Sequence, residues 1–191
     1  MIEVWRVDLD TAAVPPPSLG EAARAARFAR AELARRYLAA HGALRAVLSR
    51  FTAKPLEFAL LEKGKPYLPL APEIRFNLSH SHGRALIAVA RGIEVGVDIE
   101  HLRPVPHYAA LVERYFPPGE PEPAGELEFL RRWTQLEALW KARGAGLYGS
   151  GMPLEGGWSV APVDVGAGYA AAIAWEGAAL PVTIHDFGED Q

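Results

Sequence analysis

The sequence predicts an α+β protein built from two halves, and three observations lead to this prediction. Strand-like apolar segments lie at both ends of the chain and in its middle, whereas two longer segments have helical periodicity. The proline-containing segment 101–106 has the composition of a linker, so we place a boundary between residues 1–101 and residues 102–191. A chain of 191 residues is long enough to bury one good core or two small ones.

The composition excludes several classes of protein. The net charge of −3 argues against a general nucleic-acid binder, because such proteins usually carry a basic surface. The absence of cysteine excludes disulfides, thiolate metal sites and a cysteine nucleophile. The longest weakly polar run is far shorter than the ~20 residues that span a bilayer, and the N-terminus lacks the pattern of a signal peptide. We therefore expect a cytoplasmic protein that binds neither nucleic acid nor a membrane.

The elements expected before the central apolar run are a strand at 1–9, two helices within 19–51 and a short strand at 56–61. Ser18 and Glu21 have the spacing of a capping box, and Gly42 is the expected interruption between the two helices. Arginines crowd these helices and give an otherwise acidic protein a local positive surface, which suits phosphate recognition. The segment Lys63–Tyr67 brings two lysines to a tight turn, either as an ordinary surface turn or as part of a site.

The segment 76–83 places hydroxyl, imidazole and amide side chains next to one another. We expect a loop at a strand entrance that offers hydrogen bonds to an anion. The order Ser79-His80 also invites comparison with hydrolases, but neighbouring residues on one loop rarely reach each other as nucleophile and base.

The stretch Gly96–Glu100 closes the apolar run that begins at Ala85. Asp98 and Glu100 are two residues apart on an expected strand, so they lie on one face while Ile99 turns into the core. Neighbouring carboxylates repel each other unless a cation lies between them, and Mg²⁺ prefers carboxylate oxygens. The segment is therefore either a metal site or a pair of acids at a solvated strand end.

The elements expected after the linker are a short helix at 108–116, an exposed loop, a helix at 126–143, and strands at 158–160, 169–175 and 182–187. The long helix carries a narrow stripe of core residues, which is formed by Phe129, Trp133, Leu136 and Trp140. Glu137 and Lys141 lie on the flank of this stripe, one turn apart. They form either a surface ion pair worth about 0.2–0.5 kcal/mol or the wall of a cleft.

Four motifs follow one another along the chain, and each of them alone is weak. They are Phe76-Asn-Leu-Ser-His-Ser, Gly96-Val-Asp-Ile-Glu100, Trp133-Thr-Gln-Leu-Glu137-Ala-Leu-Trp-Lys141 and Gly144-Ala-Gly-Leu147. Their order and spacing resemble those of the Sfp-type 4′-phosphopantetheinyl transferases. The resemblance covers roughly residues 24–147.

The resemblance implies a fold of two similar α/β-sandwich halves in a pseudo-twofold arrangement, with the active site in the cleft between them. It implies an enzyme, a holo-[carrier-protein] synthase, that transfers the 4′-phosphopantetheine arm of coenzyme A to a serine of an apo acyl or peptidyl carrier protein and releases adenosine 3′,5′-bisphosphate. Such carriers serve fatty acid, polyketide or nonribosomal peptide synthesis. Coenzyme A would be the co-substrate and Mg²⁺ or Mn²⁺ the cofactor. Two halves in one chain favour a monomer.

The resemblance also implies roles for individual residues. Asp98 and Glu100 on one half and Glu137 on the other would hold the metal. Glu137 would also deprotonate the serine, and Lys141 would contact the pyrophosphate as the second catalytic residue. The residues implied in binding coenzyme A are Arg36, Lys65, Pro66, Ser79, His80, Asp98 and Lys141, with Arg24 as a further candidate.

Three features depart from the family pattern. Leu136 stands where the family often has lysine, so that a positive contact is either missing or supplied by Arg132. The commonest form of the first motif continues Ser-His-Ser-Gly, and His82 is an extra residue relative to that form. The region before Glu126, which helps to dock the carrier in the family, is short.

Two other classes of protein fit some of these features. One is a Mg²⁺-dependent phosphohydrolase that acts on coenzyme A or nucleotides without a carrier protein. The other is a non-catalytic module that binds coenzyme A or a carrier. Three carboxylates beside a core cost stability when they have no task, which favours an enzyme over a binding module.

Overall fold

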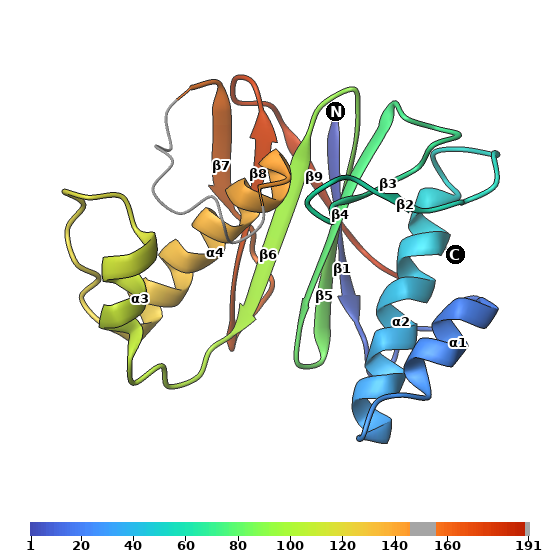
Figure 1. The fold of residues 1–191 in the computed structure, drawn as a ribbon, viewed down its shortest axis with the longest axis horizontal. Coiled ribbons are helices and arrows are strands. Elements are labelled where there is room, and N and C mark those ends of the chain that lie inside the picture. The colour runs from blue at the N-terminus through green and yellow to red at the C-terminus, as the bar shows by residue number, and fades with distance from the viewer. Residues whose placement is uncertain (146–155, 190–191) are drawn as a thin grey trace.

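The computed structural model describes residues 1–145 and 156–189. Its elements are β1 (Ile2–Asp8), α1 (Leu19–Ala25), α2 (Ala31–Leu48), β2 (Ala59–Leu60), β3 (Pro66–Tyr67), β4 (Ile74–Ser81), β5 (Arg84–Arg91), β6 (Val95–His101), α3 (Tyr108–Tyr115), α4 (Glu126–Arg143), β7 (Trp158–Pro162), β8 (Tyr169–Glu176) and β9 (Val182–Asp186). The predicted α+β class is therefore confirmed (Figure 1).

Two main sheets form the centre of the molecule. The first has the strand order β4-β5-β1-β9, and the second has the order β6-β8-β7. All pairs are antiparallel except β1 and β9, which run parallel, with Val4 opposite Ile184. β2 and β3 form a separate small hairpin.

The sheets and the two long helices stack in four layers. One face of the first sheet packs against α2, for example through Val89 and Leu48. Its other face packs against the second sheet, where Leu86 and Val97 belong to one buried cluster. The far face of the second sheet carries α4, through Leu139 and its neighbours. In Figure 1, α2 lies to the right of the first sheet, and α4 lies on the left, where it overlaps the second sheet in this view.

Sheet membership does not follow the predicted boundary after His101. β6, which closes the predicted first half, pairs with β8 of the second sheet, with Asp98 opposite Ala172. β9, at the far end of the predicted second half, pairs with β1 and completes the first sheet. Strand pairing joins residues that are far apart in the sequence, so local sequence patterns do not predict which strands will pair.

Two predicted local features are wrong. Gly42 lies inside α2 and does not separate two helices, since the break falls at residues 26–30. Its missing side chain instead makes room for Val14, whose Cβ would lie 2.7 Å from a Cβ on Gly42. The segment predicted as a loop at 76–83 is mostly strand β4, because Asn77, Ser79 and Ser81 bond to the neighbouring strand β6, whereas His80 and His82 are exposed.

The helix predicted at 126–143 has those bounds, and its predicted stripe packs as expected. Phe129, Leu136 and Trp140 are buried in one cluster, and Trp133 packs against its edge. Gly144 ends the helix in the left-handed conformation, with φ of 64°. Among the residues that the structure describes, no helix combines the length and the apolar composition that crossing a bilayer needs.

Candidate active site

A close contact between α4 and β6 positions the site. A Cβ on Gly96 would lie 2.2 Å from the Ala138 carbonyl oxygen and 2.3 Å from the Ala142 amide nitrogen. Real side chains do not approach so closely, so only glycine lets the helix lie against the strand at this point. The contact brings Glu137 and Lys141 of α4 over Asp98 of β6.

Asp98, Lys141 and Ser79 form a hydrogen-bonded cluster. The Lys141 Nζ donates to Asp98 Oδ1 at 2.5 Å and to Ser79 Oγ at 3.0 Å. Ser79 Oγ in turn donates to Asp98 Oδ1 at 2.9 Å. The cluster joins three elements, β4, β6 and α4. Asp98 is 3% exposed and Ser79 6%, whereas the Lys141 side chain is 30% exposed.

Glu137 completes the cluster as a second acidic group. Its carboxylate lies 3.7 Å from the Lys141 Nζ. Burial, followed by the negative charge of Asp98, raises the pKa of Glu137 to about 7. A carboxylate of this kind suits proton transfer near neutral pH or coordination of a cation.

Glu100 lies at the rim of the cluster, further along β6. Its Oε2 accepts hydrogen bonds from Arg103 at 2.7 Å and from Ser81 Oγ at 3.2 Å. It therefore shares a strand face with Asp98, as predicted, but in this structure it is paired with an arginine. Within residues 1–145 and 156–189, no three His, Asp or Glu side chains stand ready-arranged around a common metal position.

The chemistry of the donors nevertheless fits a divalent cation. The Oδ2 atom of Asp98 is buried and accepts no hydrogen bond from the described part of the chain. An unpaired buried carboxylate oxygen beside a second carboxylate is costly unless a cation neutralises it. Asp98 and Glu137 would hold such a cation, and Glu100 could join them by exchanging its contact with Arg103.

A cavity of about 600 Å³ opens beside Glu100 toward α2. Its lining combines cationic and aromatic side chains, among them Arg30, Arg36, Arg103, His80, Tyr37 and Phe28. Arg36 is held in place by Asp10, through hydrogen bonds of 2.8 and 2.7 Å, and by Glu32 at 2.7 Å. The predicted ligands Arg36 and His80 therefore share one cavity with Glu100, whereas the predicted ligand Ser79 is directed into the carboxylate cluster.

His82, the extra residue of the loop, lies at the rim of the same cavity. It occupies the turn between β4 and β5 with φ of 51°, and its ring stacks on His101 at 4.1 Å between centroids. The insertion is therefore absorbed by the turn, and the register of β4 against β5 is continuous from Ile74 to Ser81.

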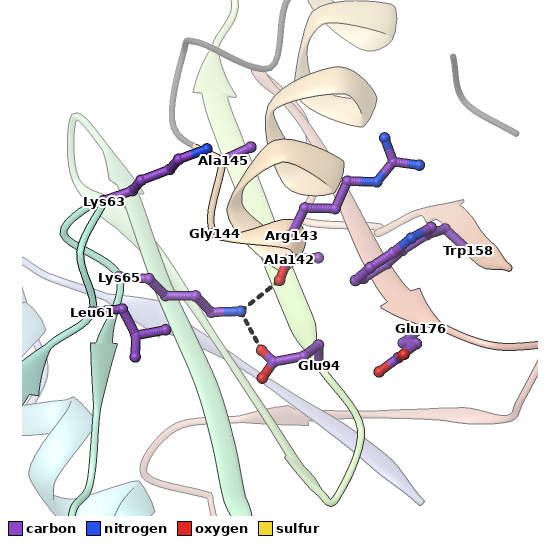
Figure 2. A pocket seen from close by; sticks show the side chains of 10 residues that line it. All are labelled: Leu61, Lys63, Lys65, Glu94, Ala142, Arg143, Gly144, Ala145, Trp158 and Glu176. Atoms are coloured by element: carbon purple, nitrogen blue, oxygen red, sulfur yellow. Dashed lines mark hydrogen bonds and ion pairs between the residues drawn. The ribbon is translucent and has the colours of Figure 1, made fainter. Parts of the chain in front are cut away.

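Lys65 is a structural clamp in this structure. Its Nζ donates to Glu94 Oε2 at 2.6 Å, to the Ala142 carbonyl at 2.7 Å and to the Val95 carbonyl at 3.2 Å. Figure 2 shows the side chain reaching from its loop to the C-terminal end of α4, at the edge of a cavity of about 560 Å³. The ammonium thus ties the Lys63–Tyr67 turn to both elements that carry the site.

We expect Lys65→Met to destabilise the protein by about 2 kcal/mol, because it leaves the Ala142 carbonyl without its charged donor and removes one of the two cations that pair with Glu94. Urea denaturation followed by circular dichroism measures this change. The exposed neighbour Lys63 provides the control, since Lys63→Met should change the free energy of unfolding by less than about 0.5 kcal/mol. Equal stability of the two variants would contradict the clamp.

Two arginines that the sequence suggested as site residues, Arg132 and Arg24, contact aromatic side chains in the structure, and the contacts of Ser81 were not predicted. Arg132, the candidate to supply the positive contact missing at Leu136, pairs with Glu120 and lies over the ring of Phe116. Arg24 lies over the ring of Tyr37 at 5.7 Å. Gly146 and Leu147 of the fourth motif lie outside the described residues. Sequence reasoning missed the contacts of Ser81, although its period-two spacing from Ser79 was a signal.

Comparisons with known proteins agree with the geometry. A family model described as the 4′-phosphopantetheinyl transferase superfamily matches residues 94–185. The chain is 34% identical over 165 residues to the 4′-phosphopantetheinyl transferase HetI of Nostoc sp., covering 76% of this chain and 70% of that protein. It is 37% identical over 151 residues to the 4′-phosphopantetheinyl transferase AcpT of Escherichia coli K12, covering 75% of this chain and 72% of that protein.

A third relative is a 4′-phosphopantetheinyl transferase of Bacillus pumilus, which is 33% identical over 143 residues. The match covers 70% of this chain and 60% of that protein. The region matched by the family model, from Glu94 to His185, contains β6 and α4 of the carboxylate cluster and therefore Asp98, Glu137 and Lys141. The chain therefore belongs to the 4′-phosphopantetheinyl transferase superfamily.

Proposed function

We propose that this protein transfers the 4′-phosphopantetheine arm of coenzyme A to a serine of an apo carrier protein, in a reaction that requires Mg²⁺. The observation that carries the proposal is the cluster of Asp98, Glu137 and Lys141, with its buried and unpaired Asp98 Oδ2. The family matches do not favour the phosphohydrolase or the non-catalytic module.

The predicted metal ligands are Asp98, Glu137 and, after release from Arg103, Glu100. A divalent cation bound there would neutralise charge on the pyrophosphate of coenzyme A. This assignment is supported by the two carboxylates that already lie together and by the raised pKa of Glu137. Mn²⁺ would take the same oxygen ligands.

The chain's own residues supply the rest of the chemistry. Glu137 accepts the proton of the carrier serine as the serine oxygen attacks the β-phosphorus of coenzyme A. The bond from this phosphorus to the oxygen that bridges the two phosphates breaks, and the electron pair leaves on adenosine 3′,5′-bisphosphate. Lys141 lies within reach of Glu137 and Asp98 and places a positive charge beside the phosphates as negative charge builds up.

The cavity beside Glu100 suits the adenosine end of coenzyme A. Arg36 and His80 line it and would hold the phosphates there, and Arg30 and Arg103 add positive charge to the same cavity. The resemblance also places Lys65 and Pro66 at the adenine, but neither residue lines this cavity, and the Lys65 ammonium is engaged by Glu94 and the Ala142 carbonyl.

The pseudo-twofold arrangement of two similar halves is proposed on the same resemblance. It is supported by a helix packed on a sheet on each side of the molecule, α2 on one side and α4 on the other. The site would lie between them. A monomeric state and a cytoplasmic location remain predictions from the sequence.

The test is intact-protein mass spectrometry of several apo carrier proteins incubated with this protein, coenzyme A and Mg²⁺. We expect one carrier to gain the mass of one phosphopantetheine arm, and we expect EDTA to abolish the gain, because it removes the cation that Asp98 and Glu137 would hold. Excess Mg²⁺ added after EDTA should restore it. Cleavage of coenzyme A without any gain in carrier mass would instead support hydrolysis.

A further inference from the structure

The two main sheets meet at a seam between β4 and β6. Each of these strands is the edge of its own sheet, and they are not paired with each other by a backbone ladder. Side chains of β4 bridge the gap: Asn77 Oδ1 accepts from the Val97 amide at 2.9 Å, and further along Ser79 and Ser81 reach the carboxylates of β6. The bridging residues alternate along β4, because only one face of the strand is turned toward β6.

The Ser79 hydroxyl fixes the orientation of the Asp98 carboxylate. It accepts its hydrogen bond from Lys141 and therefore directs its single hydrogen to Asp98 Oδ1. Oδ1 thus receives both donors of the cluster, whereas Oδ2 receives none from the described residues. The buried carboxylate is held with one oxygen occupied and the other free.

The Ser81 hydroxyl repeats this arrangement one step along the seam. Its oxygen accepts the His101 amide at 3.0 Å, so its hydrogen is directed to Glu100 Oε2 at 3.2 Å. Two serines two residues apart on β4 therefore face two carboxylates two residues apart on β6. The spacing of the serines matches the spacing of the proposed metal ligands.

We propose that Ser79 and Ser81 are positioning residues, which hold Asp98 and Glu100 so that one oxygen of each ligand stays available to the cation. The inference rests on the proposed function, since it assigns these serines to the metal site. It differs from the role that the family resemblance implies for Ser79, which is a contact with the phosphates of coenzyme A. Ser79 is 6% exposed, and the structure gives its hydroxyl a donor and an acceptor within the protein.

The two roles predict different measurements. Without Ser79, the Asp98 carboxylate is free to rotate and to give both oxygens to Lys141, so the metal must displace that pairing. Loss of such an orienting partner typically weakens metal binding by about 10- to 100-fold. Loss of a phosphate contact would instead raise the KM for coenzyme A and leave metal binding in the absence of coenzyme A unchanged.

The test uses Mn²⁺ alone as the probe, titrated against the purified protein without coenzyme A, with free Mn²⁺ followed by electron paramagnetic resonance. We expect Ser79→Ala to weaken Mn²⁺ binding by about 10- to 100-fold and Ser79→Thr, which keeps the hydroxyl, to regain most of it. Ser159 provides a control, since its hydroxyl bonds the distant Gly177 carbonyl and Ser159→Ala should bind Mn²⁺ like the wild type.

Carrier-loading kinetics provide the second readout. High metal concentration should restore the kcat of Ser79→Ala, with the KM for coenzyme A unchanged at saturating metal. Wild-type Mn²⁺ affinity in this variant, with a raised KM for coenzyme A, would overturn the inference and leave the proposed function intact.

A wild-type protein that binds no Mn²⁺ would remove the proposed metal site and this inference together. If Ser79→Ala does not fold, Ser81→Ala carries the test, because Ser81 is only partly buried. It is judged by the same comparison of Mn²⁺ affinity and KM.

Discussion

Asp98→Asn is expected to lower kcat/KM for carrier loading by at least about 10²–10³-fold, while the protein remains folded. The amide has the shape of the carboxylate but lacks the charge that pairs with Lys141 and that would hold a cation. Asp98→Ala should abolish transfer altogether. The measurement is the initial rate of mass gain on the carrier over a range of Mg²⁺ concentrations, with circular dichroism to monitor the fold.

The matched control is Asp164→Asn, which changes an exposed aspartate whose carboxylate bonds a nearby turn amide. It should load the carrier at the wild-type rate. A wild-type rate in Asp98→Asn would show that the cluster is not the site of the reaction.

Gly96→Val is expected to give the largest loss of stability, by about 3 kcal/mol or more. Even the first carbon of the new side chain would lie 2.2 Å from the Ala138 carbonyl oxygen, so α4 must move away from β6. Because Glu137 and Lys141 move with the helix, a shift of about 1 Å would also slow transfer by about 100-fold. Denaturant titration and carrier loading measure the two effects on the same sample.

Gly20→Ala is the control for this substitution. A Cβ at Gly20 meets nothing within 4 Å, and alanine in the helix α1 should stabilise the protein by up to about 1 kcal/mol. If Gly96→Val were as stable and as active as the wild type, the close packing of α4 on β6 would be wrong.

The parts of the site that the sequence predicted were those set by local spacing. The period of two in Gly96–Glu100 put Asp98 and Glu100 on one face, and the period of 3.6 in α4 put Glu137 and Lys141 on one flank. The family motifs then connected strand and helix. The metal-ligand assignment itself stays a prediction, which the cluster supports through Asp98 and Glu137.

The parts that the sequence could not predict depend on what each residue faces. The polar segment 76–83 has the composition of a loop, yet it is mostly a strand because β6 lies beside it and accepts its polar side chains. The resemblance placed Lys65 at the adenine. In the structure its ammonium donates hydrogen bonds to Glu94 and to the Ala142 carbonyl, which are distant in sequence. Composition describes a residue's chemistry but not its neighbours.

The late position of β9 in the chain has a consequence for synthesis on the ribosome. β1 is synthesised well before β9, and one of its edges pairs with β5 while the other has no partner until β9 has been made. Until residues 182–186 have left the exit tunnel, the nascent chain exposes an unpaired strand edge, which is a template for aggregation. The arginine Arg6 near this edge, later paired with Asp186, places a charge there that discourages pairing with another chain in the meantime.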